Sequence, residues 1–197
     1  MNAKSHVLIS GTGRAGTTFL VQLLTELGFD TGKGQYFENC SAGLEHDLRD
    51  NNAPFIVKSP HLCDHIDDIV NNSDKLIKHL IVPIRDIYSA AESRRNVHRQ
   101  AQQENPLVQD VPGGLWGTSD PLEQESVLAL KFHKLVQASC AHGIPITFLD
   151  FPRFVHDPKY LKGELIKIFG SFRLWSWRYN SAFKKTCKIH LIHDYKP

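Results

Sequence analysis

The feature that most constrains the fold is a strand, a glycine-rich loop and a helix in direct succession near the N-terminus. The apolar run 6–10 predicts a buried strand, which Gly11 ends. The loop continues to Gly16, after which apolar residues recur at helical spacing until Gly28, a residue type common at helix C-termini. The alternation of strand and helix continues downstream, and it decides the fold class.

Three further apolar runs predict strands at 54–58, 80–84 and 144–149. Helical patterns lie between and after them, at 62–70, 86–103, 121–142 and 157–169, with a short helix expected near 44–48. This order predicts an α/β protein with a central parallel sheet flanked by helices. A length of 197 residues fits one domain, 1–197.

In such sheets, ligands bind at the carboxyl ends of the strands. The candidate site is therefore built by the loops that follow Ser10, Lys58, Ile84 and Leu149. Residues 104–120 carry prolines and glycines, so we expect a loop there that acts as a lid. The last residues, 171–197, are aromatic and basic and support no prediction of secondary structure.

Composition excludes several classes of protein. The formal net charge is only +2, whereas a nucleic-acid binder usually has a concentrated basic face. The cysteines are too far apart in sequence for a paired metal motif or a dense disulfide framework, so reduced thiols are expected at Cys40, Cys63, Cys140 and Cys187. No apolar segment is long enough for a signal peptide or a membrane span. We therefore expect a cytoplasmic protein.

The loop from Gly11 to Thr18 has the G-x-x-x-x-G spacing of a P-loop. Its glycines allow backbone N–H groups to point at phosphate oxygens, and the following helix N-terminus adds a positive dipole end. The loop departs from that of an ATP or GTP hydrolase at one position, since Thr17 stands where those proteins carry lysine. The cation lies inside the loop instead, at Arg14. The pattern favours a single-domain P-loop fold that binds a 5′ phosphate and a neighbouring anion.

Two motifs carry a resemblance to a known family. Residues 13–20, Gly-Arg-Ala-Gly-Thr-Thr-Phe-Leu, resemble the loop that binds the 5′-phosphosulfate in sulfotransferases. Residues 80–95 resemble the family's segment for the 3′ phosphate, in which a strand ends in arginine and a serine follows eight residues later, as Arg85 and Ser93 do. Arginine offers a planar fork for phosphate, and the serine lies about two helical turns further on.

The resemblance implies that the chain binds 3′-phosphoadenosine 5′-phosphosulfate (PAPS) and that adenosine 3′,5′-bisphosphate is the product. The implied cofactor-binding residues are Gly13, Arg14, Ala15, Gly16, Thr17, Thr18, Phe19, Arg85 and Ser93. Weaker matches at 55–60, 148–151, 157–158 and 169–170 extend the resemblance over about residues 6–170. The C-terminal Lys-Gly-rich motif of the cytosolic family members is not present.

The implied reaction is an in-line transfer of a sulfuryl group to a hydroxyl or amine of a small molecule or carbohydrate, and it requires no metal. Arg14 and Lys58 would balance charge at the sulfonate. Family members use either His or Glu as the base that takes the acceptor's proton. His61 and Glu45 are equal candidates here, with Glu38 and His46 next.

Other interpretations remain open at this stage. A P-loop kinase of a nucleotide or small metabolite keeps the fold, but Thr17 disfavours it, and so does the third apolar run, which leads into Arg85 and not into a convincing magnesium-binding Asp. A non-catalytic nucleotide-binding module is compatible with every motif. The basic run 94–99 either attracts an anionic ligand or forms a solvated helix face. The tryptophans either stack on a ligand or pack in the core, at Trp116, Trp175 and Trp177.

Overall fold

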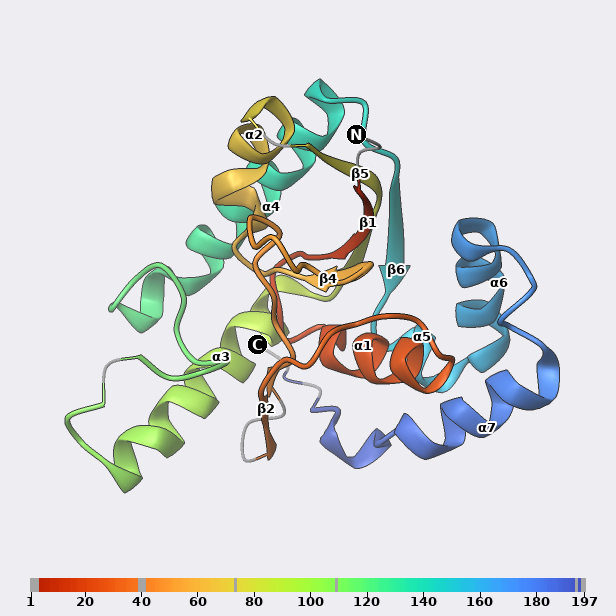
Figure 1. The fold of residues 1–197 in the computed structure, drawn as a ribbon. Helices are drawn as coiled ribbons and strands as arrows, with labels where there is room; N and C mark the ends of the chain where they lie inside the picture. The colour runs from red at the N-terminus through yellow and green to blue at the C-terminus, as the bar shows by residue number, and fades with distance from the viewer. Residues whose placement is uncertain (1–3, 39–41, 73, 109, 194, 196–197) are drawn as a thin grey trace.

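The central sheet has four parallel strands in the order β4-β1-β5-β6 (Figure 1). A computed structural model describes residues 4–38, 42–72, 74–108, 110–193 and 195. The strands are β1 (Lys4–Ile9), β4 (Ile56–Lys58), β5 (Lys75–Ile84) and β6 (Ile146–Asp150). The predicted α/β fold with a parallel sheet is therefore confirmed.

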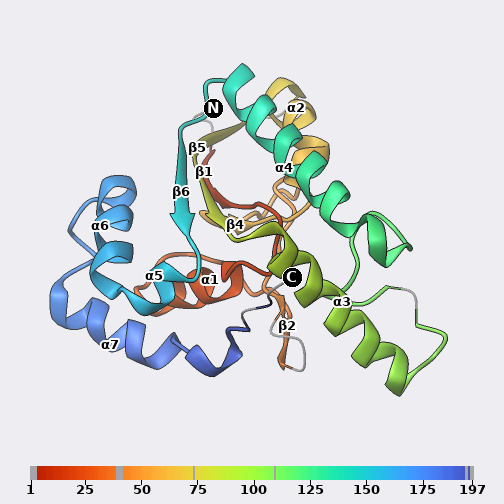
Figure 2. The ribbon, with the colours of Figure 1, turned by 180° about the vertical axis from the view of Figure 1, so that it is seen from behind.

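Helices cover both faces of this sheet. One face carries α2 (Leu62–Asn72) and α4 (Gln124–Ala141), which lie side by side in both views (Figures 1 and 2). The other carries α1 (Thr17–Glu26), α5 (Arg153–His156), α6 (Pro158–Phe169) and α7 (Ser176–Thr186). The helix α3 (Ile87–Glu104) follows β5 and packs against α4. Because β1 is covered on both faces, its apolar residues alternate between two cores, with Val7 and Ile9 in one and Leu8 in the other.

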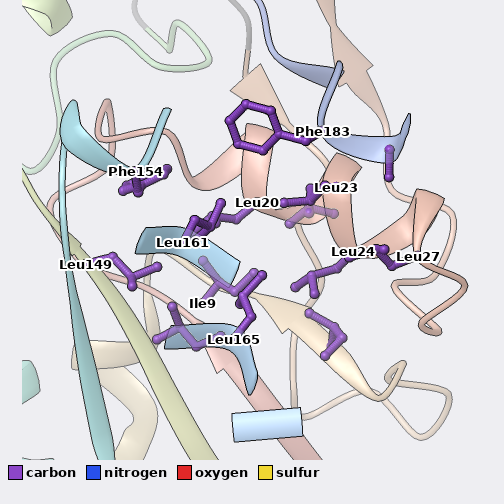
Figure 3. Close-up of a cluster of buried hydrophobic side chains, with 14 of the residues drawn as sticks. Ile9, Leu20, Leu23, Leu24, Leu27, Leu149, Phe154, Leu161, Leu165 and Phe183 are labelled. Carbon is purple, nitrogen blue, oxygen red and sulfur yellow. The ribbon is translucent and has the colours of Figure 1, made fainter. Parts of the chain in front are cut away.

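The larger core lies between the sheet and α1 (Figure 3). Leucines at helical spacing on α1 meet apolar side chains from β6, α5, α6 and α7, and the figure labels Leu20, Leu23, Leu24, Leu27, Leu149, Phe154, Leu161, Leu165 and Phe183. This packing holds the start of α1, and therefore the glycine loop before it, in one place relative to the sheet.

The short helix predicted near 44–48 is wrong. A two-stranded antiparallel hairpin precedes this region, formed by β2 (Tyr36–Phe37) and β3 (Ala42–Gly43). The backbone of Leu44 has a positive φ of 60°, and its N–H donates to the Gln35 carbonyl at 2.6 Å. The His46 N–H donates to the Lys58 carbonyl at 3.0 Å. The backbone groups that a helix would use are therefore already paired with neighbouring segments.

The segment 171–197, for which the sequence supported no prediction, contains α7 and a 3-10 turn, η3 (Ile189–Leu191). Cys63, Cys140 and Cys187 are free thiols, whereas Cys40 lies outside the described residues. Among the described helices, none combines the length and the apolar character needed to cross a bilayer.

A buried histidine predicts that the fold loses stability in acid. His6 on β1 is fully buried, and its Nδ1 lies 2.7 Å from the Pro54 carbonyl oxygen. Burial lowers the pKa of His6 below its ordinary value of 6.5, while the Pro54 carbonyl opposes this effect. The unfolded chain therefore binds a proton more readily than the folded chain as the pH falls below about 6.5, and stability is lost in that window.

We expect the free energy of unfolding, measured with urea between pH 8 and pH 5, to fall more steeply in the wild type than in His6→Gln. The variant removes the titrating group while keeping a polar side chain. His190→Gln, at an exposed position, is the matched control and should follow the wild type. Parallel loss of stability in the wild type and in His6→Gln would contradict this assignment.

Candidate functional site

A cavity of about 240 Å³ lies at the carboxyl ends of the parallel strands. The chain leaves β1 toward β4 and leaves β5 toward β6, so the loops after these two neighbouring strands diverge. Crevices form at such switch points in open α/β sheets. All four predicted loops contribute lining residues, among them Ser10, His61, Arg85 and Phe151.

The glycine loop forms one wall of this cavity. It ends at Gly16, which is the N-cap residue of α1 and has a positive φ of 76°. No side chain caps the helix there. A Cβ atom at Gly16 would come within 2.8 Å of Phe154 Cζ, so the core beneath the loop leaves room for glycine alone. The N-terminal N–H groups of α1 thus remain available for an anion, with Thr17 and Thr18 lining the cavity beside them.

The structure brings almost every predicted site residue to this one cavity. The lining residues from that set are Gly13, Arg14, Gly16, Thr17, Thr18, Phe19, Glu45, Lys58, His61, Arg85 and Ser93. Ala15 differs, because its side chain is buried in the core beneath the loop and is not among the lining residues. Glu38 and His46 are also not among them, which leaves Glu45 and His61 as the candidate bases at the cavity.

Lys58 reaches across from β4 to the glycine loop. Its side chain is 5% exposed, and its ammonium donates to the Gly43 carbonyl at 2.6 Å and to Thr18 Oγ1 at 3.1 Å. The Glu45 carboxylate lies 3.4 Å away. Burial lowers the pKa of Lys58, and the charge of Glu45 opposes that shift. A cation is therefore fixed beside the first turn of α1, with one carboxylate next to it.

The two predicted phosphate-binding segments are physically joined. Arg14 in the glycine loop donates through Nε to Ser93 Oγ at 3.0 Å. Arg85 donates through Nη1 to the Arg14 carbonyl at 2.7 Å, and its guanidinium lies 5.2 Å from the centre of the Phe151 ring. Arg14, Arg85 and Ser93 therefore form one connected hydrogen-bond network.

The C-terminal segment completes the wall beyond Arg85, and sequence reasoning missed it. Its lining residues are Thr186, Lys188, Leu191, Ile192 and His193. Arg85 donates through Nη2 to the His193 carbonyl, and Ser89 Oγ donates to the Tyr195 carbonyl at 2.8 Å. The aromatic and basic composition of this segment was the available signal, but its residues have no periodic pattern that places them.

The sequence also left the role of Arg94 undecided. It belongs to the basic run on α3, yet it is 6% exposed and lines the cavity rather than a solvated helix face. Trp116 packs beside it, with the Arg94 guanidinium 5.2 Å and the Lys131 ammonium 4.7 Å from its ring centre. The Trp116 indole packs against these cations and also lines the cavity, whereas Trp175 and Trp177 are exposed and are not among the lining residues.

Loop residues 113–116 are held in place rather than loosely attached. The backbone of Trp116 makes two hydrogen bonds with the buried Gln124 side chain, at 2.7 and 3.1 Å. A Cβ atom at Gly113 would lie 3.1 Å from Arg14 Nη1, so this part of the loop closes directly over the cation of the glycine loop.

Within the described residues, no group of three or more His, Cys, Asp or Glu side chains is arranged to hold a metal ion.

Comparisons with known proteins bear on the fold. A scan against protein-family models found no match, and a search of curated proteins found none. Among solved structures, the chain is similar to the sulfotransferase domain from the curacin biosynthetic pathway, with a TM-score of 0.54 and 13% sequence identity. The match covers 85% of this chain and 74% of that domain. The chain therefore has a sulfotransferase-like fold.

Proposed function

We propose that this single-domain chain is a sulfotransferase that uses PAPS as the donor and a hydroxyl or amine as the acceptor. The observation that carries the proposal is the charge of the cavity. Five basic side chains line it, whereas Glu45 is the single carboxylate among the described lining residues; the basic ones are Arg14, Lys58, Arg85, Arg94 and Lys188. Lys58 and Arg94 are buried among them, and an excess of positive charge at one cavity suits an anionic ligand.

The distribution of these charges suits a ligand with anionic groups at two places. The glycine loop, with Arg14 and Lys58, forms the binding site for a 5′ phosphate and its attached sulfonate. Arg85 and Lys188 lie toward the C-terminal segment, where a second phosphate would bind. Phe19 and Phe151 add apolar surface on that side, which suits an adenosine.

In the proposed transfer, Glu45 accepts the proton of the acceptor hydroxyl or amine as that atom forms its bond to sulfur. The bond between sulfur and the bridging oxygen breaks, and its electron pair stays on the 5′ phosphate. Arg14 and Lys58 stabilise the negative charge that builds on the sulfonate and on that leaving oxygen. Glu45 is favoured over His61 because it lies beside Lys58 and so beside the glycine loop, whereas the His61 ring packs edge-on against Trp116.

The kinase alternative is weaker on two counts. Thr17 stands in the position of the P-loop lysine, and the residue directly after β5 is Arg85, where a magnesium ligand would be an aspartate. The acceptor side of the cavity is lined by Tyr36, Ala42, His61 and Trp116, which gives a partly aromatic surface with polar edges. A small molecule or carbohydrate suits such a surface.

We expect adenosine 3′,5′-bisphosphate to bind at least about tenfold more tightly than ATP, because a charge-assisted hydrogen bond to the 3′ phosphate contributes about 1.5–3 kcal/mol. Titration calorimetry with and without Mg²⁺ measures this preference. Adenosine 2′,5′-bisphosphate is the matched control, since it has the same charge with one phosphate moved. Tighter binding of ATP with Mg²⁺ would favour the kinase, and tight bisphosphate binding without turnover of any hydroxyl or amine acceptor would favour the non-catalytic module.

A further inference from the structure

Arg94 is a buried cation whose partners are backbone carbonyls. It donates to the Thr12 carbonyl through Nε at 3.3 Å and through Nη2 at 2.8 Å. Its Nη1 donates to the Gly114 carbonyl at 2.8 Å. In the described part of the chain, no carboxylate forms an ion pair with it. Burial, and then the charge of Arg14, lowers the pKa of Arg94 to about 9. Burying a guanidinium without a carboxylate partner costs free energy, so we expect this position of Arg94 to serve a function.

Its contact with Thr12 decides where the next N–H group points. The Thr12–Gly13 peptide is trans, so its carbonyl and its N–H point in opposite directions. Because Arg94 holds the carbonyl from one side, the Gly13 N–H is directed to the other side. This N–H donates no hydrogen bond to any described residue, and Gly13 lines the cavity. It is therefore available to an anionic oxygen.

The same contact explains why residue 13 is glycine. A Cβ atom at Gly13 would overlap Arg94 Nη2, and the backbone has a positive φ of 69°, which disfavours any other residue. Arg94 also connects two walls of the cavity, because Gly114 belongs to loop 113–116 and the Trp116 ring stacks on the guanidinium. One side chain thus sets the position of the glycine loop against the loop that covers Arg14.

We propose that Arg94 is the positioning residue of the glycine loop, which aims the Gly13 N–H at the ligand's anionic group and holds loop 113–116 against the glycine loop. The inference rests on the proposed function only for the identity of the ligand. Arg95 provides the contrast, since its guanidinium bonds to Glu92, Glu125 and the Pro121 carbonyl and does not line the cavity. Neighbouring arginines on one helix therefore have separate tasks.

The test compares Arg94→Met and Arg94→Lys with the control Arg95→Met. Affinity for adenosine 3′,5′-bisphosphate and for inorganic diphosphate is measured by calorimetry, and the Gly13 amide is followed by ¹⁵N NMR during both titrations. Removing the hydrogen bonds that orient the peptide should weaken both ligands about two- to tenfold in Arg94→Met. The Gly13 amide proton should move downfield on binding in the wild type and in Arg95→Met. This shift should be lost in Arg94→Met and partly retained in Arg94→Lys.

The outcomes separate this inference from the proposed function. If the wild type binds diphosphate with a Gly13 shift but does not prefer the bisphosphate, the sulfotransferase assignment fails and the role of Arg94 stands. If Arg94→Met binds the bisphosphate with wild-type affinity and an unchanged Gly13 shift, Arg94 contributes only to the stability of the fold and the inference fails. If neither Arg94 variant folds, the wild type still decides, because a Gly13 amide that does not respond to either ligand overturns the proposal.

Discussion

Replacing Glu45 with glutamine is expected to slow sulfuryl transfer about 100- to 10,000-fold, which is the contribution of a general base to the rate. Glutamine keeps the size of the side chain and an oxygen beside the Lys58 ammonium, so the cavity keeps its shape. It removes the negative charge and, with it, the ability to accept the acceptor's proton. Initial rates with a true acceptor, measured at saturating PAPS, report this loss directly.

Binding of adenosine 3′,5′-bisphosphate separates the catalytic role of Glu45 from a structural one. Its affinity should be almost unchanged in Glu45→Gln, because the proposed base acts on the acceptor rather than on the donor. His61→Asn is the matched variant, since His61 also lines the cavity, and it should keep most of its turnover. Loss of turnover in His61→Asn, with turnover retained in Glu45→Gln, would make His61 the base. Full turnover in both variants would place the base outside this pair, and Glu38→Gln is then the next variant to measure.

Replacing Arg85 with alanine is expected to weaken adenosine 3′,5′-bisphosphate binding by about tenfold to a hundredfold, since charge-assisted hydrogen bonds to phosphate contribute about 1.5–3 kcal/mol. Arg85 lies at the end of β5, where it already donates to the Arg14 carbonyl and to the His193 carbonyl. A phosphate oxygen would compete with the His193 carbonyl for this guanidinium. Calorimetry of the wild type and of Arg85→Ala measures the loss.

A ligand without the 3′ phosphate provides the internal control. Adenosine 5′-phosphate should bind the wild type and Arg85→Ala with nearly equal affinity, because it lacks the 3′ phosphate that Arg85 is proposed to bind. Arg85→Lys should bind the bisphosphate with intermediate affinity, since lysine keeps the charge and loses the planar fork. Equal weakening of both ligands in Arg85→Ala would mean that Arg85 acts by holding the Arg14 backbone and the C-terminal segment, and would remove the 3′-phosphate assignment.

Local patterns in the sequence predicted the α/β fold and the glycine loop. Both depend on residues close together in the chain: an apolar run that ends at glycine, and leucines at helical spacing from Leu20 to Leu27. The two phosphate motifs were also local, and the ends of β1 and β5 brought Arg14, Arg85 and Ser93 together because these strands are neighbours in a parallel sheet.

Only the tertiary structure decided the rest, because the deciding contacts join residues far apart in the chain. The segment 44–48 has no helix since its backbone pairs with Gln35 and Lys58. The sequence left open whether the basic run that begins at Arg94 attracts an anionic ligand or forms a solvated helix face, and the structure shows Arg94 buried at the cavity with a bond to Thr12, 82 residues away. The carbonyl of His193 meets Arg85 across 108 residues. Sequence periodicity reports which face of an element is apolar, but it carries no information about which distant carbonyl will satisfy a buried cation.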